Sequence, residues 1–301
     1  MIKKVLICGL GAVGSTYANK IINEDIELKI LVDQNRLERY KNNPIIFNGE
    51  KMDLEYILPN STDYKADLII ITTKFDGLQD AIKNIKNFIS ENTIILSLLN
   101  GVTSEIHIAR EYGWEKVLLS YFIGHSAVRT GRSVTQDGVG KIVFGAKTNS
   151  QLHKVQLVKE FFDKCKIDYE IPEDMEYALW LKFMFNVSAN QPSAILNMTF
   201  GEMQANPKFM ELSKKLMFEV QAIAKAEGVK NTEKMIDDAL KGFEKMTPEG
   251  QASTLQDVLA KRKTEVDIFA GAIIELGAKH NIPVPYNTFM YEMIKAIEAN
   301  Y

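Results

Sequence analysis

The first part of the chain alternates short apolar runs with amphipathic stretches. The apolar runs are rich in Ile, Leu and Val, which is typical of strands buried on both faces of a sheet. Strands that alternate with helices form parallel sheets with right-handed crossovers. The pattern therefore predicts an α/β domain. Its predicted strands are 4–9, 28–32, 67–72, 93–98 and 117–122, and its predicted helices are 13–23, 77–89, 103–110 and 151–164.

Two hairpins are predicted within this α/β part. Asn48-Gly49 separates the apolar segments 45–47 and 51–54, and this dipeptide is typical of a two-residue hairpin turn. A second hairpin is predicted over 131–145, with its turn near Asp137-Gly138.

The pattern changes near Glu173, where strand-like runs end and helical periodicity takes over. Gly and Pro residues separate the helical segments. The chain is therefore expected to have a Rossmann-type parallel-sheet domain at 1–171 and an all-helical domain at 172–301. The predicted helices of the second domain are 175–189, 207–227, 232–245, 254–280 and 286–299.

Composition narrows the functional classes. The 301 residues are 46% hydrophobic and 25% charged with a net charge of −3, so nothing indicates nucleic-acid binding. Cys8 and Cys165 lie in apolar surroundings and are expected to be buried, reduced thiols, and the four scattered histidines predict no metal site. Glycines interrupt the N-terminal apolar run and no run is long enough for a membrane span. A cytoplasmic protein is expected.

The strongest local motif is the sequence Gly9-Leu10-Gly11-Ala12-Val13-Gly14, which lies between the first predicted strand and helix. The first glycine allows a tight turn, the second lets the backbone approach a pyrophosphate, and the third lets the helix pack on the sheet. The N-terminus of the helix then offers free N–H groups and partial positive charge. The position of the motif favours a dinucleotide site over a ligand-free glycine turn.

The residues after the second strand leave the choice of dinucleotide open. Asp33 follows Gly14 at the spacing where an acidic residue accepts hydrogen bonds from the adenosine ribose, which favours NAD(H). Arg36 and Arg39 are near enough in sequence to contact the extra phosphate of NADP(H), although both also fit an ordinary solvated helix face.

A polar stripe crosses the first helix of the second domain. Lys182, Asn186 and Asn190 are spaced by four in an apolar, aromatic segment, so an α-helix would place them on one face. A stripe that simply faces solvent is the plainer alternative. Ser253 and Glu265 have plain alternatives too, since Ser253 fits a helix N-cap and Glu265 fits an ion pair with Lys261.

These residues together resemble the 2-dehydropantoate 2-reductase (ketopantoate reductase) family over essentially the whole chain. The matching segments are the glycine motif, Thr73-Lys74, Leu99-Asn100-Gly101, Leu179-Trp180-Leu181-Lys182-Phe183-Met184-Phe185-Asn186 with Asn190, Ser253-Thr254-Leu255-Gln256-Asp257-Val258, and Arg262-Lys263-Thr264-Glu265-Val266-Asp267.

The resemblance implies the reduction of 2-dehydropantoate to (R)-pantoate with NADPH, on the route to pantothenate and coenzyme A. It implies that Lys182 is the general acid and that Glu265 also belongs to the catalytic site. It places Lys74 and Asn100 between cofactor and substrate. Substrate contacts are assigned to Asn100, Asn186, Asn190 and Ser253.

One departure from the family concerns the cofactor. Members that use NADPH commonly have arginine at the end of the second strand, where this chain has Asp33, so use of NADH stays open. The only partner expected is a small 2-keto acid, and a homodimer is one option for the oligomeric state. Two other functions remain: a related 2-keto-acid, 3-hydroxy-acid or opine-type dehydrogenase, and a dinucleotide-binding redox sensor without catalysis.

Two points of geometry follow from the predicted elements. An unbroken helix over 254–280 would separate Ser253 from Glu265 by about 18 Å, too far for one small acid to contact both. Both residues reach the substrate only if Ser253 precedes the helix, with Ser253 or Thr254 as its N-cap, or if long side chains converge. His125 follows a strand and could approach the nicotinamide, although a loop histidine without such a role is the plainer interpretation.

Overall fold

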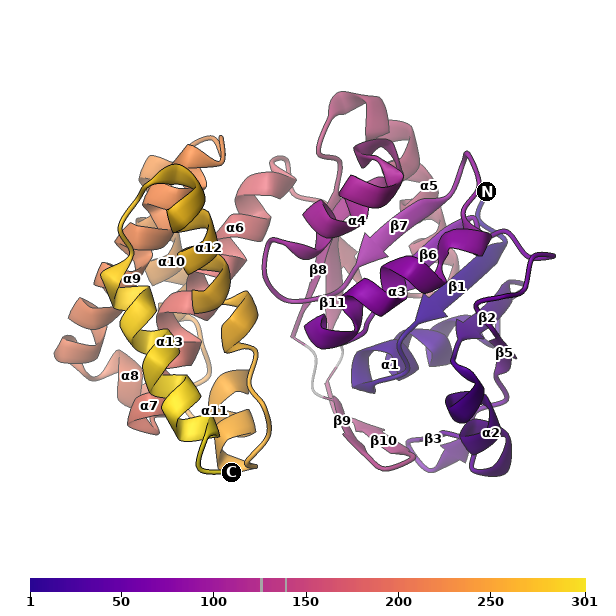
Figure 1. Cartoon of the computed structure of the whole chain (residues 1–301), viewed down its shortest axis with the longest axis horizontal. Helices are drawn as coiled ribbons and strands as arrows, with labels where there is room; N and C mark the ends of the chain where they lie inside the picture. The colour runs from indigo at the N-terminus through magenta and orange to yellow at the C-terminus, as the bar shows by residue number, and fades with distance from the viewer. Residues whose placement is uncertain (125–126, 139) are drawn as a thin grey trace. The chain divides into compact units, whose positions relative to one another are not determined.

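The computed structural model describes residues 1–124, 127–138 and 140–301 (Figure 1). This part of the chain forms two compact units. The first contains residues 1–99 and 104–175, and the second contains residues 100–103 and 176–301. The short loop that begins at Asn100 therefore groups with the helical unit.

An eight-stranded sheet forms the centre of the first unit, in the order β12-β11-β8-β7-β6-β1-β2-β5. From β8 to β5 every neighbouring pair is parallel, whereas β11 pairs antiparallel with β8. The parallel core confirms the predicted α/β class. The strands are β1 (Lys4–Cys8), β2 (Glu27–Leu31), β5 (Glu55–Ile57), β6 (Leu68–Ile71), β7 (Ile94–Ser97), β8 (Val117–Ile123), β11 (Lys141–Gly145) and β12 (Tyr169–Glu170).

Helices cover both faces of this sheet (Figure 1). Leu6 and Ile7 are adjacent in β1 and fully buried, and they belong to different core clusters. Ile7 packs in the cluster of α1 (Ala12–Ile21) and α5 (Leu152–Lys164), whereas Leu6 packs in the cluster of α3 (Leu78–Asn84) and α4 (Ser104–Tyr112). Burial on both faces explains why the strands appear as continuous apolar runs. The remaining helix of this unit is α2 (Gln34–Asn42).

A second, four-stranded sheet in the order β4-β3-β10-β9 tests the two hairpin predictions. The first is confirmed, because β3 (Ile46–Phe47) and β4 (Glu50–Lys51) pair antiparallel across Asn48-Gly49, both at positive φ. The second is wrong. β10 (Ser133–Gln136) pairs with β9 (Ala127–Thr130), and β11 pairs instead with β8 of the large sheet. The Gly131 turn, at φ +60°, closes the β9–β10 hairpin.

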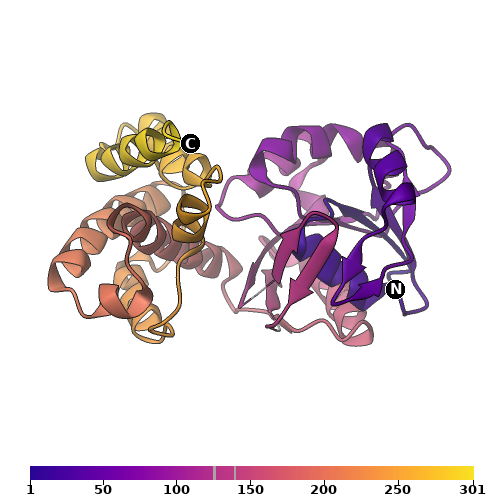
Figure 2. The same ribbon diagram turned by 90° about the horizontal axis from the view of Figure 1, so that it is seen from below.

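The second unit is built of helices, and no strand occurs among its residues 176–301, all of which the structure describes (Figures 1 and 2). Its apolar periodicity produces buried stripes, such as Leu216, Val220 and Ile223 of the longest helix. The helices are α6 (Met175–Phe185), a π-helical turn (Asn186–Asn190), α7 (Gln191–Leu196), α8 (Phe200–Gln204), α9 (Pro207–Ala226), α10 (Met235–Glu244), α11 (Ser253–Leu259), α12 (Ala270–His280) and α13 (Pro285–Glu298).

Single 3-10 turns connect several of these elements. They are Phe75–Gly77, Lys86–Phe88, Trp114–Lys116, Asn149–Gln151, Thr232–Lys234 and Val266–Ile268.

The long helix predicted over 254–280 is wrong. α11 ends at Leu259, a 3-10 turn covers Val266–Ile268, and α12 begins only at Ala270. Lys261 adopts φ +50° at the end of α11, where Gly or Asn is usual, so the sequence carries no ordinary stop signal. The break makes residues 260–269 an irregular segment, and Glu265 lies in its middle.

Other predictions concern the cysteines, metals and membranes. Cys8 and Cys165 are buried free thiols, as expected, and burial raises the pKa of Cys8 to about 12 and that of Cys165 to about 11. Within the described ranges, no group of three or more His, Cys, Asp or Glu residues could hold a metal. In the same ranges, no helix has the length and hydropathy of a membrane span.

Candidate functional site

The glycine motif forms a tight turn between β1 and α1. Gly9 has φ +105°, and a Cβ atom on it would lie 2.7 Å from the Thr73 nitrogen. A Cβ on Gly14 would lie 2.0 Å from the Gly9 carbonyl oxygen, so only glycine lets α1 approach the turn this closely. The Thr72 hydroxyl donates a 2.6 Å hydrogen bond to the same carbonyl and fixes the turn to the end of β6.

Gly11 differs from its two neighbours in the motif. It is the N-cap of α1 at an ordinary φ of −75°, and a Cβ built on it meets nothing within 4 Å. Neither strain nor crowding in the protein itself therefore requires glycine here. The space in front of Gly11 and the N-terminus of α1 fits a pyrophosphate that approaches the backbone closely.

A pocket of about 570 Å³ opens at this turn within the first unit. It includes the predicted cofactor residues Gly9, Leu10, Gly11, Asp33 and Lys74, whereas Ala12, Val13 and Gly14 form the first turn of α1 and do not line it. The rest of its lining contains cations that could meet phosphate groups. The further lining residues are Cys8, Leu31, Val32, Arg36, Arg39, Tyr40, Thr72, Thr73, Gly77, Asp80, Ala81, Asn84 and Arg129.

Asp33 has a structural role as well as a place in the pocket. It is the N-cap of α2, two residues beyond the end of β2, and its carboxylate accepts a 2.7 Å hydrogen bond from the Arg36 backbone nitrogen. The Arg36 guanidinium lies 3.6 Å from the other carboxylate oxygen, and both side chains are about half exposed. Asp33 therefore offers an acceptor to a ribose while a cation stands beside it.

Arg129 is a pocket residue that sequence reasoning missed. It comes from β9, and its guanidinium donates to the Leu10 carbonyl in the glycine motif. It also lies over the Tyr40 ring, 5.7 Å from the centroid. No local pattern in the sequence indicates this role, because 119 residues separate Arg129 from Leu10.

Tyr40 holds two of the pocket arginines. The Arg39 guanidinium lies 5.0 Å from the centre of its ring, and its hydroxyl accepts a hydrogen bond of 3.3 Å from Arg39 and of 3.4 Å from Arg129. Burial alone would raise the pKa of Tyr40, but the two guanidinium groups lower it below its usual value. The hydroxyl thus orients positive charge within the pocket.

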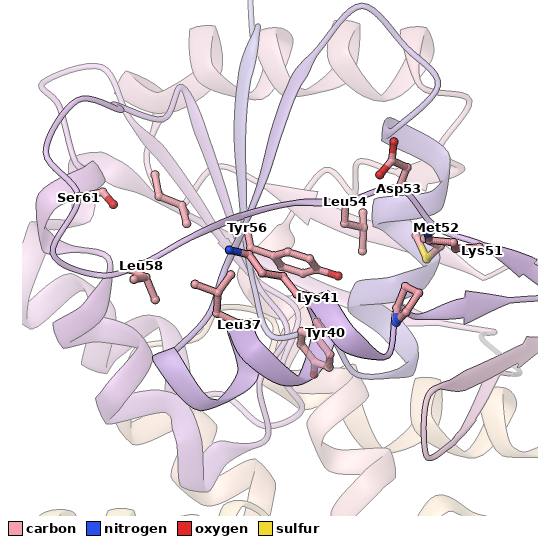
Figure 3. Close-up of a pocket in the computed structure, with 12 residues that line it drawn as sticks. Leu37, Tyr40, Lys41, Lys51, Met52, Asp53, Leu54, Tyr56, Leu58 and Ser61 are labelled. Carbon is pink, nitrogen blue, oxygen red and sulfur yellow. The ribbon is translucent and has the colours of Figure 1, made fainter.

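A second pocket, of about 470 Å³, is also lined by residues of α2 (Figure 3). Residues of α2, the β3–β4 hairpin and β5 surround it, and Tyr40 also lines the first pocket. It contains neither the glycine motif nor Asp33, so the first pocket is the better candidate for a dinucleotide. The lining residues of the second pocket are Leu37, Tyr40, Lys41, Pro44, Lys51, Met52, Asp53, Leu54, Tyr56, Ile57, Leu58 and Ser61.

Three predicted residues form a hydrogen-bonded chain inside the helical unit. The Lys182 Nζ of α6 donates a 2.9 Å hydrogen bond to Asn100 Oδ1. Asn100 Nδ2 donates a 2.7 Å hydrogen bond to Glu265 Oε2. Residues distant in sequence are thus brought together, with an amide between the ammonium and the carboxylate.

The three remaining candidates, Asn186, Asn190 and Ser253, lie in or next to the π-turn. Asn186 and Asn190 are buried within it, and Asn190 Nδ2 is 3.4 Å from Ser253 Oγ. A π-turn rotates less per residue than an α-helix, so the uniform α-helical spacing assumed for the stripe does not hold in its last turn. π-turns occur frequently at functional sites.

Gln191 fixes the end of this turn. The side chain is fully buried; its amide nitrogen donates to the Val187 carbonyl at 2.9 Å, and its oxygen accepts from the Ala270 nitrogen at 3.1 Å. The π-turn is thereby tied to the start of α12.

The expected capping role of Ser253 or Thr254 is wrong. Ala252 is the N-cap of α11, and Ser253 is the first helical residue, exposed and close to Asn190. The predicted conflict between Ser253 and Glu265 rested on one unbroken helix, and the irregular segment 260–269 removes that premise. His125 lies outside the described residues.

Known proteins match the chain along nearly its full length. Residues 5–149 match the family model described as "Ketopantoate reductase PanE/ApbA", and residues 174–298 match its C-terminal model. A 2-dehydropantoate 2-reductase from Aquifex aeolicus is 29% identical over 306 residues, covering 99% of this chain and 98% of the relative.

Solved structures of related proteins have the same fold as this chain. A putative 2-dehydropantoate 2-reductase from Enterococcus faecalis is 25% identical with a TM-score of 0.76, covering 99% of this chain and 98% of that one. A D-mandelate dehydrogenase solved with NADH and anilino(oxo)acetate shares the fold at a TM-score of 0.86 and 21% identity, with the same coverage. The chain belongs to the ketopantoate reductase family of NAD(P)H-dependent oxidoreductases.

Proposed function

We propose that this chain reduces the keto group of 2-dehydropantoate to give (R)-pantoate, on the route to pantothenate and coenzyme A. The family and the relatives that bear this name support the reaction. The structural observation that carries the proposal is the hydrogen-bonded chain of Lys182, Asn100 and Glu265, because it presents an oriented proton donor.

The dinucleotide is proposed to bind at the glycine turn of the first unit. Backbone N–H groups of the turn and the first residues of α1, from Gly9 to Val13, would hold the pyrophosphate, with Gly14 allowing the helix to pack. Asp33 would accept a ribose hydroxyl, and Lys74 lines the same pocket. When bound, the nicotinamide supplies the hydride that reduces the keto carbon.

Lys182 is proposed as the general acid. As the keto carbon is reduced, negative charge grows on its oxygen, and an ammonium placed there stabilises the transition state more than the ground state. Lys182 Nζ then transfers a proton to that oxygen, giving the product hydroxyl and a neutral amine that solvent reprotonates. The hydrogen bond to Asn100 orients the Lys182 amine, and the hydrogen bond to Glu265 orients the Asn100 amide.

Asn186, Asn190 and Ser253 are proposed to bind the carboxylate and hydroxyl of the substrate. The 3.4 Å approach of Asn190 to Ser253 places two hydrogen-bonding groups together at the π-turn. The substrate is a small keto acid with one carboxylate, and these amide and hydroxyl donors suit it. The long side chain of Lys182 provides the cation.

Both NADH and NADPH are proposed to serve as cofactor. Asp33 can accept from a free ribose hydroxyl, while Arg36, Arg39 and Arg129 line the same pocket and could meet an added phosphate. The Asp33 carboxylate already has Arg36 beside it, which reduces its repulsion of a phosphate.

The comparisons do not favour a 3-hydroxy-acid, opine-type or other 2-keto-acid dehydrogenase, or a non-catalytic redox sensor. A cytoplasmic location and a homodimer remain part of the proposal, and sedimentation of the purified chain tests the second.

The decisive experiment follows nicotinamide absorbance with 2-dehydropantoate, using NADPH and NADH in parallel. Pyruvate and an aryl 2-keto acid serve as comparison substrates. A kcat/KM for 2-dehydropantoate well above that for the comparison acids supports the proposed function. Faster turnover of another keto acid would reassign the substrate, and tight dinucleotide binding without turnover would support a sensor.

A further inference from the structure

We infer that the last two turns of α13 are a positioning device for Glu265. Tyr291, Lys295 and Glu298 are four and three residues apart, so they share one face of this helix. They bond to Thr264 and Asp267, which lie on either side of Glu265 in the irregular segment. This inference rests on the proposed role of Glu265.

Glu298 holds the N-terminal side of the segment. Its Oε1 accepts two hydrogen bonds from Thr264, one from the backbone nitrogen and one from the hydroxyl, both at 2.7 Å. Thr264 is 5% exposed and the Glu298 side chain is 11% exposed, so solvent screens these charge-assisted bonds little. They fix the backbone one residue before Glu265.

Tyr291 and Lys295 hold the other side. The Tyr291 hydroxyl donates a 2.9 Å hydrogen bond to Asp267 Oδ1, and Lys295 Nζ lies 3.6 Å from the same oxygen. Lys295 also lies 3.2 Å from Glu298, which links the two halves of the device. Burial alone would lower the pKa of Lys295, but Glu298 and Asp267 raise it, so this bridging cation stays charged.

The segment needs such support because it has no continuous helical hydrogen bonds of its own. α11 has ended, the 3-10 turn begins only at Val266, and Glu265 has φ −97° and ψ 25°. A catalytic group must be held to within about 0.5 Å by the residues around it. Glu265 in turn accepts a hydrogen bond from Asn100, and Asn100 accepts one from Lys182. A displacement of the segment would therefore also move Lys182 through the Asn100 amide.

The test compares E298Q with E292Q. Glu292 is exposed on the same helix, so the control makes the same chemical change away from the segment. We expect E298Q to lower kcat by about 5- to 50-fold, because small misplacement of a catalytic group is costly, while the Kd for the dinucleotide stays unchanged. E292Q is expected to match the wild type in both.

A double-mutant cycle separates positioning from general damage. If Glu298 acts through Glu265, then E298Q has almost no further effect on kcat in an E265Q background. Equal loss of kcat in both backgrounds would overturn the inference, as would wild-type kcat in E298Q alone.

Amide hydrogen exchange provides a measurement that needs no turnover. The Thr264 amide is expected to lose protection in E298A, which removes the acceptor oxygen that glutamine would keep, and to retain protection in E292A. Unchanged protection in E298A would overturn the inference. If the wild type fails to reduce 2-dehydropantoate, the proposed function fails whatever the exchange shows. If the wild type is active and only the Glu298 results are negative, the device alone is refuted.

Discussion

The Lys182 ammonium donates a hydrogen bond to the Asn100 amide oxygen, 2.9 Å away. Asn100 in turn donates to Glu265 at 2.7 Å. An amide has a donor at one end and an acceptor at the other, so it can satisfy both charged groups at once. This arrangement links the Lys182 ammonium to the Glu265 carboxylate through the Asn100 amide.

Replacing Lys182 tests this arrangement. We expect Lys182→Ala to lower kcat by about 10²–10⁴-fold, since general acid assistance of this kind is lost. Dinucleotide affinity should stay near the wild-type value, because the residues proposed to hold the dinucleotide at the glycine turn lie in the first unit. Steady-state kinetics and dinucleotide titration measure the two effects, and near-normal turnover would remove Lys182 from the mechanism.

The glycine motif allows a matched pair of substitutions. Gly11→Ala meets no atom within 4 Å and suits the φ of −75°, so the folded protein should keep or slightly raise its thermal midpoint. The added methyl would stand where the pyrophosphate approaches, and the dinucleotide Kd is expected to rise at least about tenfold, or about 1.4 kcal/mol.

Gly14→Ala is the structural control for that substitution. Its Cβ would lie 2.0 Å from the Gly9 carbonyl oxygen, so α1 must shift and the thermal midpoint should fall. Calorimetry and dinucleotide titration on both variants separate the two roles. A Gly11→Ala protein that binds dinucleotide normally would contradict the placement of the pyrophosphate.

Much of this fold could be predicted because its signals are local. The apolar runs predict β1, β2, β6, β7 and β8 almost to the residue, since burial on both faces fixes their composition. The glycine turn is equally local, because sterics at Gly9 and Gly14 exclude other residues. Asn48-Gly49 determines its hairpin by turn geometry.

The sequence-based predictions fail where long-range contacts determine the local structure. Lys261 ends α11 in a left-handed conformation that its residue type does not favour, so an unbroken helix was the natural prediction. β11 pairs with β8 rather than with β10 because strand pairing in the large sheet, and not the nearby Asp137-Gly138, determines its partner. Arg129 reaches Leu10 through tertiary structure alone.

Arg129 supports a prediction about cofactor binding. Arg129→Gln should weaken dinucleotide affinity, and more for NADPH than for NADH if its charge meets the added phosphate. Arg132→Gln, an exposed position in the same hairpin, should leave both affinities unchanged. Titration of both variants with both dinucleotides measures the effect. Equal weakening for the two dinucleotides would place Arg129 near the shared pyrophosphate instead, and no weakening would exclude contact with the cofactor.

The ion pairs of Glu227 predict a pH dependence of stability in the helical unit. Glu227 is the C-cap residue of α9, accepts a hydrogen bond from Lys279 at 2.6 Å and also contacts His280, and its side chain is 15% exposed. Burial alone would raise its pKa, but these partners lower it below the usual 4.5. A lowered native pKa means that the stabilisation is fully present above pH 4.5 and is lost as the pH falls through the native value.

Glu227→Gln should therefore reduce the free energy of unfolding by about 1–2 kcal/mol at pH 7, the scale of a charge-assisted hydrogen bond. The difference from the wild type should shrink steadily below pH 4.5. Glu233→Gln, at an exposed position in the following 3-10 turn, is the control and should change little. Denaturant unfolding of the three proteins from pH 7 to pH 3 gives the comparison. A deficit in Glu227→Gln that persists undiminished at pH 3 would show that packing, rather than the carboxylate charge, stabilises this end of α9.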